Sequence, residues 1–69
     1  MQAKWILRSS HLNEDGTITR DSFKGDDLQQ SLDMAEEICD WEHTLTVRIY
    51  TPQGQLFDTH EGRARFATR

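Results

Sequence analysis

The segment from Asp26 to Glu42, DDLQQSLDMAEEICDWE, constrains the fold more than any other part of this chain. Its apolar residues recur at steps of three and four, which gathers them on one face of a helix and leaves the acidic residues on the other. The segment contains seven acidic residues and no basic one. The spacing therefore predicts one amphipathic helix over 26–42, whose apolar face consists of Leu28, Ser31, Leu32, Ala35, Ile38 and Cys39.

The two ends of this predicted helix differ. Asp26 is predicted as the N-cap, because its carboxylate can accept from an unpaired backbone N–H, and Gln29 completes a capping-box spacing. At the other end, Asp40 and Glu42 lie where the helix dipole favours cations. Like charges three and four residues apart also destabilise the helix, by about 0.2–0.5 kcal/mol per pair. Selection for stability alone does not explain the acidic stripe, which we define as Asp33, Glu36, Glu37 and Asp40.

Segments with the composition of strands flank the predicted helix on both sides. The clearest lies at 44–51, where Leu45, Val47 and Ile49 alternate with polar residues and so define an inward face. In the first strand, Trp5 and Leu7 are predicted to point inward. Turn-forming residues in HLNEDG (11–16) and in Pro52-Gln53-Gly54 predict two hairpin loops. The predicted strands are 3–10, 17–23, 44–51 and 55–60.

The element order strand, strand, helix, strand, strand predicts an α+β fold, a two-layer sandwich with one helix packed on a mainly antiparallel sheet. A chain of 69 residues makes a single domain (1–69) with a small core, and we expect 62–69 to form a loosely ordered basic tail. The predicted core consists of Trp5, Leu7, Leu28, Leu32, Ala35, Ile38, Cys39, Leu45, Val47, Ile49 and Leu56.

Charge and hydropathy narrow the function classes. The net charge of -4 disfavours a general nucleic-acid binder, which needs clustered Lys and Arg. The charge is unevenly distributed, since the helix segment carries -7 and the rest of the chain has three more basic than acidic residues. No apolar run approaches the roughly 20 residues that span a bilayer, and the first ten residues lack a signal-peptide pattern, so we expect a cytoplasmic protein.

Metal and catalytic sites are not predicted. Cys39 and His43 are four residues apart, but a structural zinc site needs four ligands and no second pair lies nearby. The segment 11–22 matches part of a calcium-loop pattern, yet it has His11 and Ser22 where acidic ligands are required. The one cysteine also excludes an intramolecular disulfide. We expect no metal, no cofactor and no enzymatic activity.

One family resemblance rests on the second half of the chain. Ser31-Leu32, Ala35 and Ile38, followed by 46–49 (TVRI) and the 51–56 turn with Gly54, resemble the helix-then-hairpin half of small phage-encoded anti-CRISPR proteins that inhibit type I surveillance complexes. The resemblance covers about 26 residues and implies a non-enzymatic inhibitor that binds a basic, nucleic-acid-binding surface of a host protein. The acidic helix departs from that family, and no family binding residue is transferred to this chain.

Two binding hypotheses follow. In the first, the acidic stripe and Trp41 bind a protein partner with a basic surface, which implies a phage or mobile-element inhibitor. In the second, the sheet face and the basic tail bind nucleic acid. A homodimer is compatible with either hypothesis, because an edge strand can be covered by a second copy. The nucleic-acid-binding residues in the second hypothesis are Arg8, Arg20, Arg48, Tyr50, Arg63 and Arg65.

Overall fold

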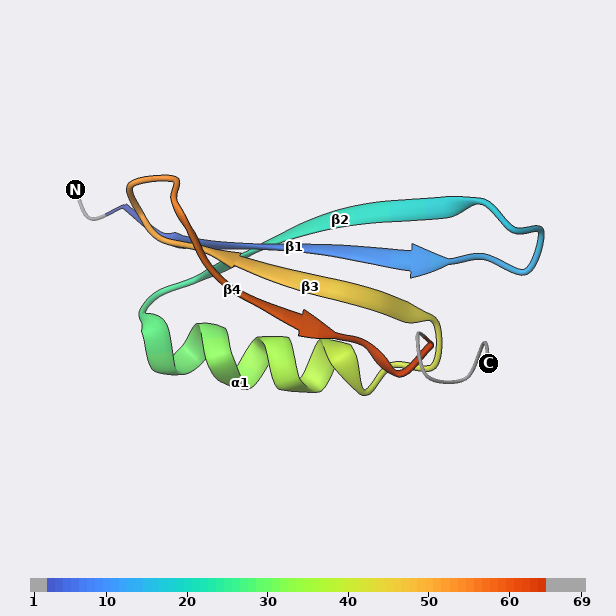
Figure 1. Ribbon diagram of the computed structural model, residues 1–69. Helices are drawn as coiled ribbons and strands as arrows, with labels where there is room; N and C mark the ends of the chain where they lie inside the picture. The colour runs from blue at the N-terminus through green and yellow to red at the C-terminus, as the bar shows by residue number, and fades with distance from the viewer. Residues whose placement is uncertain (1–2, 65–69) are drawn as a thin grey trace.

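The computed structural model describes residues 3–64 and contains one helix and one four-stranded antiparallel sheet. The strands lie in the order β2-β1-β3-β4, and α1 runs along one face of the sheet (Figure 1). The predicted α+β class and element order are confirmed. The elements are β1 (Trp5–Leu12), β2 (Ile18–Gly25), α1 (Leu28–Cys39), β3 (Thr44–Tyr50) and β4 (Leu56–Glu61).

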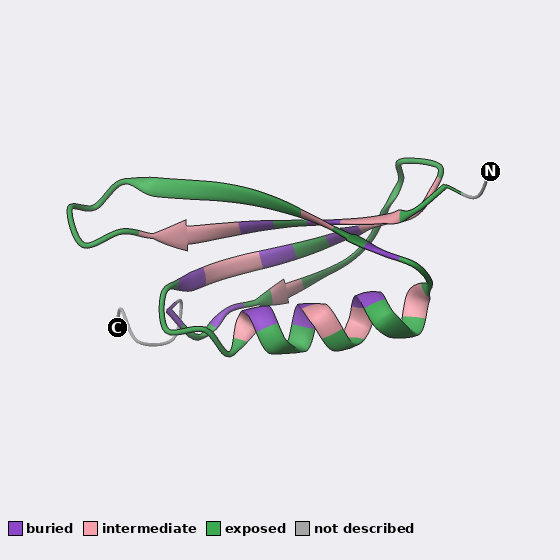
Figure 2. Cartoon of the chain, turned by 180° about the vertical axis from the view of Figure 1, so that it is seen from behind, coloured by how far each residue is buried: buried purple, intermediate pink, exposed green. Residues whose placement is uncertain are grey.

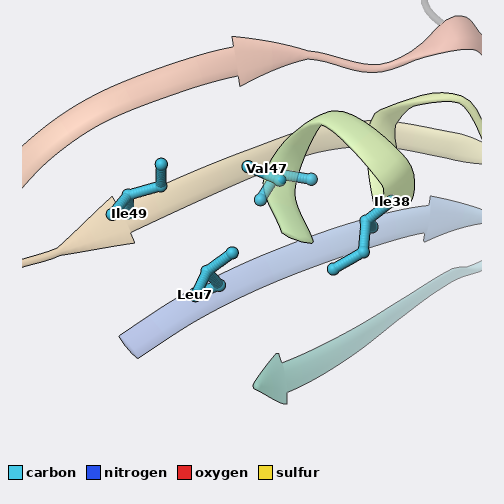
Figure 3. Packing of buried hydrophobic residues seen from close by; sticks show 5 residues of the cluster. Leu7, Ile38, Val47 and Ile49 are labelled. Atoms are coloured by element: carbon cyan, nitrogen blue, oxygen red, sulfur yellow. The ribbon is translucent and has the colours of Figure 1, made fainter. Parts of the chain in front are cut away.

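The core lies between α1 and the two central strands. Leu7 on β1 and Val47 and Ile49 on β3 are completely buried, and they pack with Ala35 and Ile38 of the helix (Figure 3). The inward positions predicted for Leu7, Val47 and Ile49 are therefore confirmed. Leu28 and Leu45, which were also predicted in the core, are half-buried and lie outside this cluster. Other apolar side chains are partly buried against this cluster: Trp5, Phe23, Leu32, Met34 and Cys39.

The prediction that Leu56 belongs to the core is wrong, because its side chain is 55% exposed. The pairing of β3 with β4 is irregular at this end: Ile49 pairs with Asp58, whereas Tyr50 pairs with Leu56. This bulge takes an extra residue out of the regular alternation. Phe57 is also 48% exposed, and its ring meets the Trp5 ring edge-on, with centroids 5.4 Å apart.

The helix begins and ends closer to its centre than predicted. The N-cap is Asp27, not Asp26, since the Asp27 carboxylate accepts from the Gln30 backbone N–H at 2.7 Å. The Gln30 side chain reaches back and accepts from the Asp26 N–H at 2.6 Å. At the other end the buried Thr44 hydroxyl donates to the Ile38 carbonyl at 2.7 Å, and the Trp41 backbone N–H donates to the same carbonyl at 3.1 Å.

The β1–β2 hairpin is longer than predicted. His11 belongs to β1 and not to the loop, which is confined to residues 13–17. Gly16 has a φ of 87° in this turn, a conformation that favours glycine. Thr17 donates to Asp15 from its hydroxyl and its backbone N–H, which lowers the pKa of that carboxyl. The hairpin extends past the C-terminal end of α1 (Figures 1 and 2).

The described part of the predicted tail is packed against the domain. Gly62 and Ala64 are buried, and the Gly62 N–H donates to the Leu45 carbonyl at 2.7 Å. A Cβ atom on residue 62 would collide with the backbone carbonyl of Thr44, so this close approach of two chain segments requires glycine. Residues 65–69, which include Arg65, lie outside the described residues.

Candidate functional site

The sheet face opposite α1 carries the strongest concentration of positive charge among the described residues. Strand register places alternate residues of β1, β2 and β3 on this face, and these residues are exposed or half-buried, as the burial colours of the strands show (Figure 2). Four of these residues are cations and none is a carboxylate. We call this set the open sheet face: Ile6, Arg8, Ser10, Leu12, Ile18, Arg20, Ser22, Lys24, Thr46, Arg48 and Tyr50.

Arg8 and Arg48 are direct cross-strand partners at the centre of this face. Like charges directly opposite each other destabilise a sheet. Their direct partners on the outer strands are uncharged, since Arg8 pairs with Ser22 on β2 and Arg48 pairs with Thr59 on β4. A sheet selected only for stability would not place two arginines opposite each other on its two central strands.

Polar and aromatic groups surround these arginines. The Arg8 guanidinium lies over the Tyr50 ring, 5.3 Å from its centroid, a cation–π contact. The hydroxyls of Ser10 and Thr46 are 2.8 Å apart and form a hydrogen bond across β1 and β3. These side chains line a shallow depression together with Arg20 and one acidic residue, Asp21. Arginine and hydroxyl side chains are the groups that contact phosphate oxygens in nucleic-acid complexes.

The structure brings together four of the six residues predicted to bind nucleic acid, namely Arg8, Arg20, Arg48 and Tyr50. Arg63 lies elsewhere: it lines a groove on the helix side of the molecule, beside the acidic stripe. The structure therefore separates Arg63 from the arginines of the sheet face. Arg65 lies outside the described residues.

The acidic stripe is exposed, as the helical spacing predicted, and all four of its carboxylates line the groove that also contains Arg63. Trp41 is not part of this groove. It follows the C-cap residue Asp40 and faces the β1–β2 hairpin, where its ring stacks on His11. The first hypothesis joined Trp41 to the stripe, but the structure places them on two different surfaces.

A network of polar side chains supports Trp41, and the sequence did not indicate it. Because the single hydroxyl proton of Thr44 is donated to the Ile38 carbonyl, its oxygen accepts from His11 Nδ1–H at 3.2 Å. His11 Nε2 then faces the Ser9 hydroxyl at 2.7 Å. Ser9 and Thr44 are buried. Only the extension of β1 to Leu12 places His11 next to Thr44, so no local sequence pattern could have revealed the contact.

Ser9, His11 and Asp21 form a serine–histidine–carboxylate group, but their geometry differs from that of a catalytic triad. A triad carboxylate holds the histidine nitrogen that faces away from the serine. Here Asp21 lies 3.6 Å from Nε2, the nitrogen that also faces Ser9. The Ser9 side chain is also buried, with an exposure of 2%. This arrangement orients His11 and leaves Ser9 closed to a substrate.

Within residues 3–64, no group of three or more His, Cys, Asp or Glu side chains is arranged to hold a metal ion. Burial raises the pKa of the Cys39 thiol, which keeps it protonated and poorly nucleophilic near neutral pH. In the described part of the chain, no helix is long and apolar enough to cross a membrane.

Comparison of the chain with models of protein families, with curated proteins and with solved structures finds no match.

Proposed function

We propose that this protein is a non-enzymatic binding module that takes a single-stranded nucleic acid on its open sheet face. The observation that carries the proposal is the direct cross-strand pairing of Arg8 with Arg48 at the centre of that face. The proposal includes the two-layer arrangement predicted from the sequence, because a helix over one side of the sheet leaves the other side to a partner. Bound phosphates would relieve the repulsion between the paired guanidinium groups.

The chemistry of the open sheet face supports a single strand more than a duplex. Tyr50 offers an aromatic ring on which a base can stack once Arg8 turns toward a phosphate, and base–aromatic stacking contributes about 1–3 kcal/mol per base. Ser10 and Thr46 add hydroxyl groups beside the cations. Within residues 3–64, no helix projects from this face to enter a major groove, since α1 lies on the other side (Figure 1).

The overall negative charge does not contradict this proposal. The acidic stripe lies on the opposite side of the molecule, and it disfavours contact between the helix side and a polyanion. A strand is thereby directed to the open sheet face. Binding then depends on local charge, and should be weak, salt-sensitive and confined to one face.

Fluorescence anisotropy with a labelled oligothymidine of about 20 nucleotides tests the proposal. We expect binding at about 25 mM salt with a log–log salt slope of about -2 to -3, since each single-strand phosphate contact contributes about -0.7. Arg8→Gln and Arg48→Gln should each weaken binding and lower the slope by about 0.7. The matched control is Arg63→Gln, which removes the same charge from the helix side and should leave binding unchanged. Absence of binding at low salt, or equal losses for all three variants, contradicts the proposal.

A second candidate is the partner interface on the acidic stripe. It is favoured by four exposed carboxylates on a helix without a basic residue. The likeness to anti-CRISPR inhibitors belongs to this candidate. Reversal of Asp33, Glu36, Glu37 and Asp40 to Lys should abolish capture of a basic protein from a host lysate, while circular dichroism remains native. Capture that is unaffected by the reversal excludes this candidate.

A further inference from the structure

An open pocket lies where the β1–β2 hairpin extends past the end of α1. It has a volume of about 400 Å³, within the range of small-ligand sites. One wall is the Trp41 indole, and the hairpin supplies the carboxylates of Glu14 and Asp21. The pocket shares none of the cations of the open sheet face, and it is separate from the groove that the acidic stripe lines.

The aromatic wall is held in place from several directions. The Trp41 ring stacks on His11, with centroids 5.8 Å apart and an interplanar angle of 25°. Phe23 lies nearly perpendicular to the indole, with centroids 6.2 Å apart. The Trp41 backbone is fixed as well, since its N–H donates to Ile38 and its carbonyl accepts from Thr44. The buried network of Ser9 and Thr44 fixes His11 in turn. A wall of this kind loses little entropy when a ligand binds.

Despite these contacts, Trp41 remains 45% exposed. A half-exposed indole beside two carboxylates, with no Lys or Arg among the lining residues, is complementary to an organic cation. The Asp21 side chain is 52% exposed and lies 3.6 Å from His11 Nε2, which leaves carboxylate lone pairs directed to solvent. Both kinds of group that a guanidinium binds, a ring face and a carboxylate, therefore meet in one pocket.

We propose that this pocket binds the guanidinium of an arginine side chain presented by a partner polypeptide, with the cation against Trp41 and hydrogen bonds to Asp21 and Glu14. Arginine fits better than lysine, because its planar group stacks on an aromatic ring while it donates in a bidentate manner to a carboxylate. The pocket is open to the surface, so a side chain can enter while its own backbone stays outside. This pocket contains none of the arginines or Tyr50 of the nucleic-acid surface, although Leu12 borders both and Asp21 also lines the arginine depression.

Two-dimensional ¹H–¹⁵N NMR tests the assignment, because it reports the Trp41 indole N–H and the Asn13 side-chain amide separately. The probes are N-acetyl-arginine-methylamide, a short arginine-containing peptide, and the same compounds with neutral citrulline, which has nearly the same shape. We expect saturable shifts at Trp41 and Asn13 with both arginine probes, with millimolar dissociation constants for the amide, and tighter binding of the peptide. The citrulline compounds should produce no chemical-shift changes at Trp41 or Asn13 at the same concentrations.

Two variants separate recognition from packing. Asp21→Asn combined with Glu14→Gln keeps the aromatic stack and should weaken arginine binding about fivefold or more, since it removes two partly exposed charges. Trp41→Leu should abolish it, with the dispersion of the spectrum as the check on folding. Equal shifts with citrulline, unchanged binding by the double variant, or shifts confined to the acidic stripe overturn the assignment. If N-acetyl-arginine-methylamide shifts these signals but the arginine-containing peptide binds no more tightly, the partner is not a polypeptide. The pocket is then a site for a small-molecule cation.

Discussion

Thr44 connects three parts of the molecule through one hydroxyl group. It is the first residue of β3, it donates to the Ile38 carbonyl near the end of α1, and it accepts from the His11 ring on β1. The side chain has no exposed surface, so water cannot replace either hydrogen bond. At this scale the structure depends on a buried polar contact between residues that are 33 positions apart in the chain.

Replacement of Thr44 by Val, which has nearly the same shape, should lower the free energy of unfolding by about 1–3 kcal/mol. The reason is that the His11 N–H loses its acceptor, while the Ile38 carbonyl loses one of its two donors and keeps the Trp41 N–H. Denaturant unfolding monitored by circular dichroism measures the change. Thr59→Val is the matched control, since Thr59 is exposed on an edge strand, and it should change stability by less than about 0.5 kcal/mol. Equal effects of the two substitutions would show that burial of the Thr44 hydroxyl has no special role.

Cys39 gives a prediction about pH. Because burial raises its thiol pKa, the fraction of reactive thiolate at pH 8 is smaller than for an unperturbed cysteine. Alkylation by iodoacetamide should be slower in the folded protein than in protein unfolded with guanidinium chloride, and its rate should keep rising at pH values where the unfolded protein has levelled off. Mass spectrometry of quenched samples follows both reactions. Identical pH profiles contradict the assignment of Cys39 to the edge of the core.

At the scale of elements, single residues fix the ends of α1. For this reason the helix boundaries predicted from the sequence differ from those in the structure. Asp26 and Asp27 are adjacent and chemically identical, so spacing alone cannot choose the N-cap between them. The choice depends on the side chain of Gln30, which accepts from the Asp26 N–H while Asp27 accepts from the Gln30 N–H. Asp26 instead pairs with Lys4, a residue that precedes β1.

Asp27→Ala should therefore reduce the free energy of unfolding by about 1 kcal/mol, the usual effect of losing an N-cap. Asp26→Ala removes only an exposed ion pair and should cost less than about 0.5 kcal/mol, because such pairs contribute little in water. Urea unfolding of the two variants decides between the two caps. A larger loss for Asp26→Ala would restore the capping box predicted from the sequence.

The strands differ in how much their sequence pattern reveals. Alternation on β1 and β3 correctly predicted Leu7, Val47 and Ile49 as core residues, because both strands are central and regular there. On β4 the same reasoning failed for Leu56. A bulge in the pairing of β4 with β3 breaks the alternation there, and no residue type near Leu56 indicates that bulge. Long-range register decides such positions, and a single sequence does not contain it.

Ile49→Ala should cost about 2–5 kcal/mol, which is the usual range for a fully buried isoleucine. Leu56→Ala should cost less than about 1 kcal/mol, since more than half of that side chain is already in contact with water. Thermal unfolding of both variants under the same conditions makes the comparison. Similar losses of stability would mean that Leu56 is packed as the sequence first suggested.

At the scale of the whole molecule, charge is divided between two opposite sides. The acidic stripe and the open sheet face lie on opposite sides of a molecule whose smallest principal extent is 15 Å, which exceeds the Debye length of about 8 Å at physiological salt. Each face is then largely screened from the other, and a chain with a net charge of -4 can still present a cationic surface. The sequence contained both charge clusters. Strand register was needed to align the arginines and to separate Arg63 from them.

The most direct test of the open sheet face as a binding surface is a ¹H–¹⁵N NMR titration of the labelled protein with oligothymidine at about 25 mM salt. We predict that chemical-shift changes concentrate on the central strands, at Arg8, Ser10, Arg48 and Tyr50, while the amides of Glu36 and Glu37 on α1 stay unmoved. A spectrum that does not change at low salt, or changes confined to α1, would contradict the claim that the open sheet face binds nucleic acid.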